Sequence, residues 1–109
     1  MATLTLKTII LGGVDVTTFE SAAAGGDEFV NDGSTFLAVN NASGGSINVT
    51  INSQVNCDQG FDHNQVVAVA AGKLILMGPY PMERWNDPDD KVQVSYSAVT
   101  SLTVIAAKL

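Results

Sequence analysis

The chain has 109 residues, of which 46% are hydrophobic and 15% charged, and its formal net charge is −6. This size suits one small domain, and the composition is that of a globular rather than a disordered chain. The five basic residues are scattered singly, so no basic patch is available to bind a nucleic-acid backbone. An acidic chain is also repelled by anionic membranes. We therefore expect one domain over residues 1–109 that binds neither nucleic acid nor membrane.

The first segment, "MATLTLKTIILGG", carries one lysine and a short apolar run interrupted by threonines. It lacks the basic region and the long apolar core of a signal peptide, and no stretch approaches the roughly 20 apolar residues of a membrane span. A single cysteine cannot form an internal disulfide. We expect a protein that is made in a cytoplasm and used there, or assembled there into something larger.

Alternation of apolar and polar residues predicts a series of short strands. In chain order these are "TLTLK", "VDVTTF", "STFLAVNN", "SINVTINS", "VVAVAA", "LILM", "KVQVSYS" and "SLTVIAAKL". Ile47, Val49 and Ile51 fall on one face of their strand, with polar residues on the other. "VVAVAA" and "LILM" are instead apolar on both faces. Because a sandwich core buries only one face of a strand, we expect a second subunit to cover the other face.

The connections favour tight reversals. "NASGGS" predicts a hairpin between strands at 35–40 and 46–52, and Gly72 predicts a second reversal. Residues 21–24 predict a short helical turn that two glycines end. Together, about eight strands predict an all-β, single-domain antiparallel β-sandwich, most simply a jelly roll.

"CDQGFDHN" holds the only cysteine, Cys57, and the only histidine, His63, with Asp58 and Asp62 between them. Residues six apart in a loop are close by default, and no oxyanion turn accompanies them. A zinc site would need Asp58 and Asp62 as unusual ligands, or a histidine from a second subunit. We expect a passive loop: the protein is not an enzyme, and has no catalytic residue, metal ligand or cofactor.

The stretch Asn86–Asp90 clusters oxygen ligands of the kind that calcium prefers. Its spacing does not match an EF-hand loop, and Pro88 stiffens it. The pattern favours an acidic surface turn before the next strand and leaves calcium binding open.

"GPYPMERW" combines residue types that are enriched at protein interfaces. With one aromatic from the loop "GGDEFVNDGS", it gives the predicted partner-contact residues Phe29, Tyr80, Met82, Arg84 and Trp85. The alternative is that the aromatic residues close one end of the sandwich core.

Three stretches, "GGDEFVNDGSTFLAVNNASGGSINVTINSQ", "VAVAAGKLILMGPYP" and "WNDPDDKVQVSYSAVTSLTVIAAKL", resemble a family of short tailed-phage proteins, the head decoration or capsid cement proteins. The resemblance runs from about Gly25 to the end of the chain. It implies a small β-rich protein on the outside of an icosahedral capsid, where trimers brace the junctions between major capsid proteins.

The primary hypothesis is therefore a structural virion protein, assembled in the host cytoplasm and bound to the capsid exterior as a homotrimer. The bridging residues would lie in the two loops that carry the predicted contacts. "MATLTLK" is a rival, because it could add as a strand to a capsid sheet edge. The alternative function is a small β-sandwich module that binds a carbohydrate or a host-cell surface ligand, with Tyr80 and Trp85 as its platform.

Overall fold

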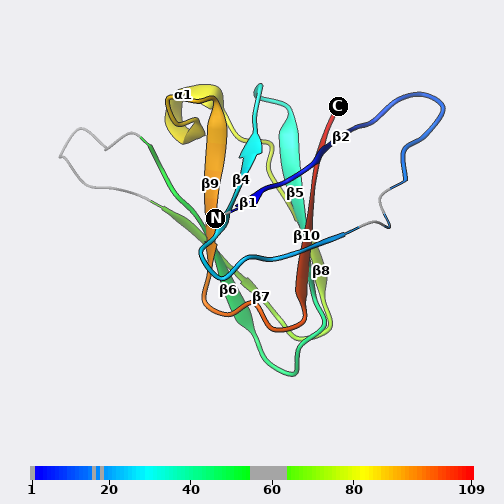
Figure 1. Cartoon of the computed structure of the whole chain (residues 1–109), viewed down its shortest axis with the longest axis vertical. Helices are drawn as coiled ribbons and strands as arrows, with labels where there is room; N and C mark the ends of the chain where they lie inside the picture. Colours follow the sequence, from blue (N-terminus) through cyan, green and yellow to red (C-terminus); the bar gives the residue numbers. More distant parts are fainter. Residues whose placement is uncertain (1, 16, 18, 55–63) are drawn as a thin grey trace.

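A computed structural model describes residues 2–15, 17, 19–54 and 64–109, and shows two sheets packed as a sandwich (Figure 1). The first sheet has the strand order β1 (Ala2–Thr3), β4 (Asp27–Val30), β9 (Lys91–Tyr96), β6 (Ile47–Ile51) and β7 (Gln65–Val69). The second has the order β2 (Leu6–Thr8), β10 (Leu102–Lys108), β5 (Thr35–Asn41) and β8 (Leu74–Met77), and β3 (Glu20–Ser21) also pairs with β10.

The core lies between the sheets and follows the period-two pattern of the sequence. Ile47, Val49 and Ile51 are 3%, 0% and 0% exposed, so the predicted inner face of this strand is confirmed. Leu37 and Val39 of β5 oppose them from the second sheet with no exposed surface. Burying one face of each strand against the other sheet supplies the hydrophobic driving force for this arrangement.

The prediction of a wholly antiparallel jelly roll is not borne out in its detail. β1 pairs with β4 in parallel, and β2 pairs with β10 in parallel, so both sheets are mixed. Ten short strands and one helix replace the eight strands expected in the described part of the chain. The difference arises in the first 30 residues, where "TLTLK" divides into two short strands that join different sheets. Glu20–Ser21 forms a further strand, and Asp27–Val30 forms another inside "GGDEFVNDGS", which the sequence predicted as a loop, whereas the described residues of "VDVTTF" form none.

Both predicted reversals occur, but they cross from one sheet to the other. β5 pairs with β8 and β10, whereas β6 pairs with β7 and β9, so the predicted hairpin is wrong. β7 and β8 likewise lie in different sheets. A turn signal in the sequence marks where the chain reverses, but both a hairpin and a crossing between sheets satisfy the same alternation of apolar residues.

The helix is not where the sequence predicted it. Glu20 and Ser21 form β3, and the chain then turns with a hydrogen bond from the amide of Gly26 to the carbonyl of Ala23 (2.9 Å). A side chain at Gly26 would come within 2.5 Å of the Val94 carbonyl oxygen, so this close approach requires glycine. The helix, α1, is instead Met82–Trp85, and the described residues of 14–19 form no strand.

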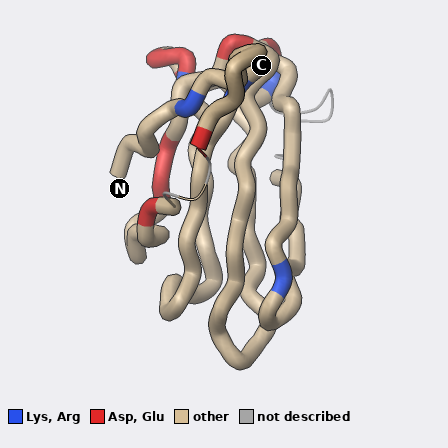
Figure 2. The backbone as a smooth tube through the Cα atoms, turned by 90° about the vertical axis from the view of Figure 1, so that its right-hand side faces the viewer, with Lys and Arg blue, Asp and Glu red and all other residues tan. Residues whose placement is uncertain are grey.

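Charged residues gather near one end of the sandwich and along one edge (Figure 2). The long strands that face the viewer in Figure 2 are almost free of them. In the described part of the chain, α1 is the one helix, and it has only four residues. No helix among these residues is long and apolar enough to cross a membrane.

Candidate partner-binding surfaces

An aromatic cluster closes the end of the sandwich beside α1. The ring centroids of Phe29 and Tyr80 are 6.1 Å apart, and those of Tyr80 and Trp85 are 5.7 Å apart in an edge-to-face arrangement. Phe29, Tyr80 and Trp85 are 0%, 6% and 9% exposed. Burial raises the pKa of the Tyr80 hydroxyl to about 12. Three of the five predicted contact residues therefore pack into the core.

Two asparagines tie together the loops that carry the predicted contacts. The Nδ2 of Asn31, which is 1% exposed, donates to the Tyr80 carbonyl (2.9 Å) and to Oδ1 of Asn86 (2.7 Å). The Nδ2 of Asn86 donates back to the Asn31 carbonyl (2.8 Å). Since these bonds are buried or partly buried, they hold the two loops in one fixed arrangement.

Met82 and Arg84 are the predicted contact residues with surface available to a partner. Met82 is 45% exposed and lies beside Gly33. The guanidinium carbon of Arg84 lies 5.0 Å from the centroid of the Trp85 ring, a cation–π arrangement. Arg84 thus stands on the buried aromatic cluster, and the α1 end presents an exposed methionine and an exposed arginine.

The loop considered for calcium uses the Asp87 carboxylate to shape a turn. Oδ1 of Asp87 accepts hydrogen bonds from the amides of Asp89 (2.8 Å) and Lys91 (3.0 Å), and Oδ2 accepts one from Gln93 (2.6 Å). Within the described ranges no group of three or more acidic, histidine or cysteine side chains is placed to hold a metal ion. Cys57, Asp58, Asp62 and His63 lie outside the described residues.

A large apolar groove lies on the outer face of the second sheet, away from the predicted contacts. Its volume is about 960 Å³, and β5, β8 and β10 contribute the outward-facing residues Phe36, Ala38, Leu74, Leu76 and Ile105 to its floor. Leu74 and Leu76 are 59% and 65% exposed, while their neighbours Ile75 and Met77 point toward the core. The outer face of "LILM" is therefore uncovered in the single chain.

The wall of the groove is the segment after β2, of which we call residues 9–15 the arm. Ile9 and Val14 of the arm and Phe19 beyond it line the groove. Ile105 and Ala107 lie outside the core cluster and yet are only 3% and 2% exposed, because this segment lies over them. The chain thus covers the β10 part of its own outer face and leaves the β8 part open.

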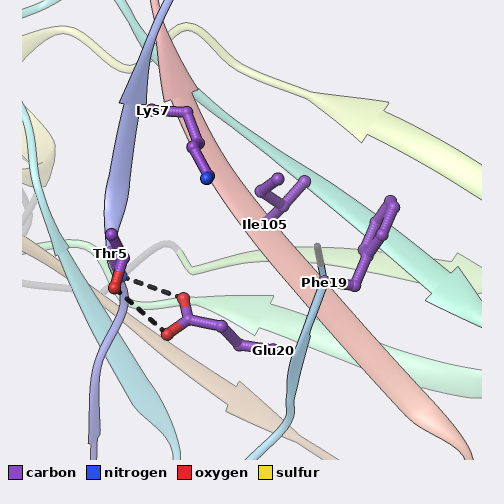
Figure 3. A pocket seen from close by; sticks show the side chains of 5 residues that line it. All are labelled: Thr5, Lys7, Phe19, Glu20 and Ile105. Carbon is purple, nitrogen blue, oxygen red and sulfur yellow. Dashed lines mark hydrogen bonds between the residues drawn. The ribbon is translucent and has the colours of Figure 1, made fainter. Parts of the chain in front are cut away.

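A smaller hollow of about 380 Å³ lies at the base of the arm (Figure 3). Lys7, Phe19 and Ile105 line it together with Glu20, whose carboxylate accepts hydrogen bonds from the amide (2.9 Å) and hydroxyl (3.4 Å) of Thr5. These two bonds fasten the residue just before β2 to Glu20 of β3, where the chain returns from the arm. We interpret the hollow as a structural feature of this junction and not as a binding site.

Sequence reasoning predicted a covered face on "LILM" but missed the arm and the groove. The signal that could have found them is "TIILGG", an apolar run that ends in two glycines rather than in polar turn residues. A turn at the surface normally carries polar residues, so this one indicates contact with another apolar surface.

Comparison of the chain with protein-family models, with curated proteins and with solved structures gave no match.

Proposed function

We propose that this protein is a decoration, or cement, protein of a tailed-phage head. It binds the outside of the assembled capsid, contacts the major capsid protein, and stabilises the junctions between capsid subunits as a homotrimer. The motive is the resemblance that runs from about Gly25 to the end of the chain. The observation that carries the proposal is the ordered, exposed Met82–Arg84 surface on the α1 end.

The α1 end suits a bridging contact because its loops are ordered before they meet a partner. The Asn31–Asn86 bonds fix both loops, so binding loses little conformational freedom there. Methionine and arginine are enriched at interface centres, and arginine pairs well with the carboxylates of a partner.

Such a protein acts by binding alone. Attachment to the assembled shell but not to free subunits stabilises the shell by mass action. Many copies around a head act together, since each junction is tied at several points and all of them must release before it opens.

The carbohydrate-binding alternative has less support. A sugar platform needs exposed aromatic faces, but Tyr80 and Trp85 are 6% and 9% exposed and meet edge to face at 67°. Their burial favours a supporting role beneath Arg84 over direct contact with a glycan.

The first test mixes purified protein with undecorated heads and measures bound density by electron microscopy and affinity by sedimentation. We expect saturable binding, and Arg84→Glu should weaken it about tenfold or more, the loss typical of a residue at an interface centre. The matched control is Lys73→Glu, the same charge reversal at an exposed site in the turn before β8, at the opposite end of the sandwich (Figure 1). Equal effects of the two variants would contradict a contact through the α1 end.

The second test compares heads with and without the protein. Heads that lack it should assemble but release DNA at a lower temperature. Equal heat stability at saturating occupancy would overturn the cement function, and specific binding on a glycan array would then favour the carbohydrate alternative.

A further inference from the structure

The arm ends in a turn that exposes large apolar side chains. The amide of Gly13 donates to the carbonyl of Ile10 (2.9 Å), which closes a tight turn with Leu11 at its first corner. Ile10 is 60% exposed and Leu11 fully exposed, at 110%. In Figure 1 this turn projects from the side of the sandwich. A leucine held at the corner of a projecting turn loses favourable burial unless another surface covers it.

The base of the arm is fixed, so its direction is set by the fold. β2 pairs with β10, and the amide of Ile9 donates to the carbonyl of Lys108 (2.7 Å). The Glu20 carboxylate holds Thr5 on the other side of the base (Figure 3). Leu11 does not line the groove of its own chain, although Ile9 and Val14 on either side of it do.

The tip and the groove are complementary in character. We call residues 9–13 the tip of the arm. The tip contains no charged residue, and no charged residue lines the groove. In a chain with a net charge of −6, two copies repel each other least where they meet through uncharged surfaces. A charged partner would instead be drawn to the end and edge where charged residues gather in Figure 2.

The exposed apolar side chains would form the centre of a contact and not the whole of it. In one contact, the tip of one copy and Leu74 and Leu76 of the next together expose on the order of 600 Å², compared with the roughly 1,600 Å² that both partners bury in a standard protein interface. The polar rim of such a contact would supply the remaining area.

We propose that a second copy of this chain occupies the groove, with the Ile10–Leu11 tip of one copy seated on Leu74 and Leu76 of its neighbour. Because each copy carries one tip and one groove, a closed ring covers both in every subunit. The inference rests on the self-association part of the proposed function and is independent of capsid binding.

Sedimentation velocity and light scattering on the purified protein, without capsids, test the proposal. The wild type should sediment as a multiple of 11.3 kDa, and the variants Leu76→Glu and Leu11→Asp should each sediment as the 11.3 kDa monomer. Both positions are exposed, so the far-ultraviolet spectrum and thermal unfolding should show a folded chain. Val66→Glu is the matched control: Val66 is 54% exposed on β7 in the other sheet, and this variant should keep the wild-type mass.

Cross-linking tests the pairing itself. In a Cys57→Ser background, which removes the only cysteine, Leu11→Cys and Leu76→Cys chains are prepared separately and then mixed under oxidising conditions. We expect a disulfide-linked dimer in the mixture and several-fold less in either variant alone. A monomeric wild type that binds an apolar dye, an assembly that survives Leu76→Glu, or the absence of mixed cross-links would each overturn the proposal.

Discussion

Asn41, at the end of β5, should contribute more to stability than any surface position of its size. It is 0% exposed. Its Nδ2 donates to the carbonyls of Gly45 (2.9 Å) and Val69 (2.8 Å), and its Oδ1 accepts from the amide (3.0 Å) and hydroxyl (2.6 Å) of Ser43. The side chain thus shapes the turn between β5 and β6 and joins the second sheet to β7 of the first.

The substitution Asn41→Ala removes all four of these bonds. At about 1 kcal/mol each the loss is about 4 kcal/mol, and the conformational freedom that an ordered asparagine side chain gives up returns about 1 kcal/mol. The expected decrease in the free energy of unfolding is therefore about 3 kcal/mol. For a domain of this size, the melting temperature should fall by about 12 °C.

Urea denaturation followed by tryptophan fluorescence and circular dichroism measures this decrease, with the slope m unchanged. Asn48→Ala is the control, because Asn48 is exposed on β6, and it should change stability by less than about 0.5 kcal/mol. Asn41→Asp should also be strongly destabilising, because it keeps the acceptor but turns a carboxylate toward two carbonyl oxygens. A loss below about 1 kcal/mol for Asn41→Ala would refute the role of Asn41 as the link between sheets.

Two further predictions concern the acidic residues of β4. Tyr96→Phe should lower stability by about 2 kcal/mol, because the Tyr96 hydroxyl donates to the fully buried Asp27 carboxylate (2.7 Å); an unchanged urea midpoint would contradict this. Hydrogen bonds from Gln93 and Thr3 hold the pKa of Glu28 at about 2, below its ordinary value of 4.5. This lowered pKa stabilises the folded state above pH 4.5, and the contribution is lost as the pH falls toward 2. Acid titrations of wild type and Glu28→Gln should therefore converge over this range, and parallel curves would refute the assignment.

The apolar runs of β7, β8 and β10 predicted three strands, and the alternation in β5, β6 and β9 predicted three more together with the inner face of the sandwich. In these strands the side chains alternate with the same period as the pleat, so local sequence decides which face is buried. Partner choice between strands was not predictable in this way. The turn after Asn41 leads across the sandwich rather than back along the same sheet, and only the contacts of Asn41 with Ser43 and Val69 distinguish the two paths.

The candidate surfaces were likewise predictable in residue type but not in exposure. The sequence identified the residue types of the α1 end, but Phe29, Tyr80 and Trp85 have the chemistry of a buried cluster as much as of an interface. Their accessibility depends on loops joined through Asn31, which lies about 50 positions before Tyr80. The groove is decided entirely by tertiary structure, since the arm and β8 are far apart in sequence and meet only because β2, β10, β5 and β8 lie side by side in one sheet.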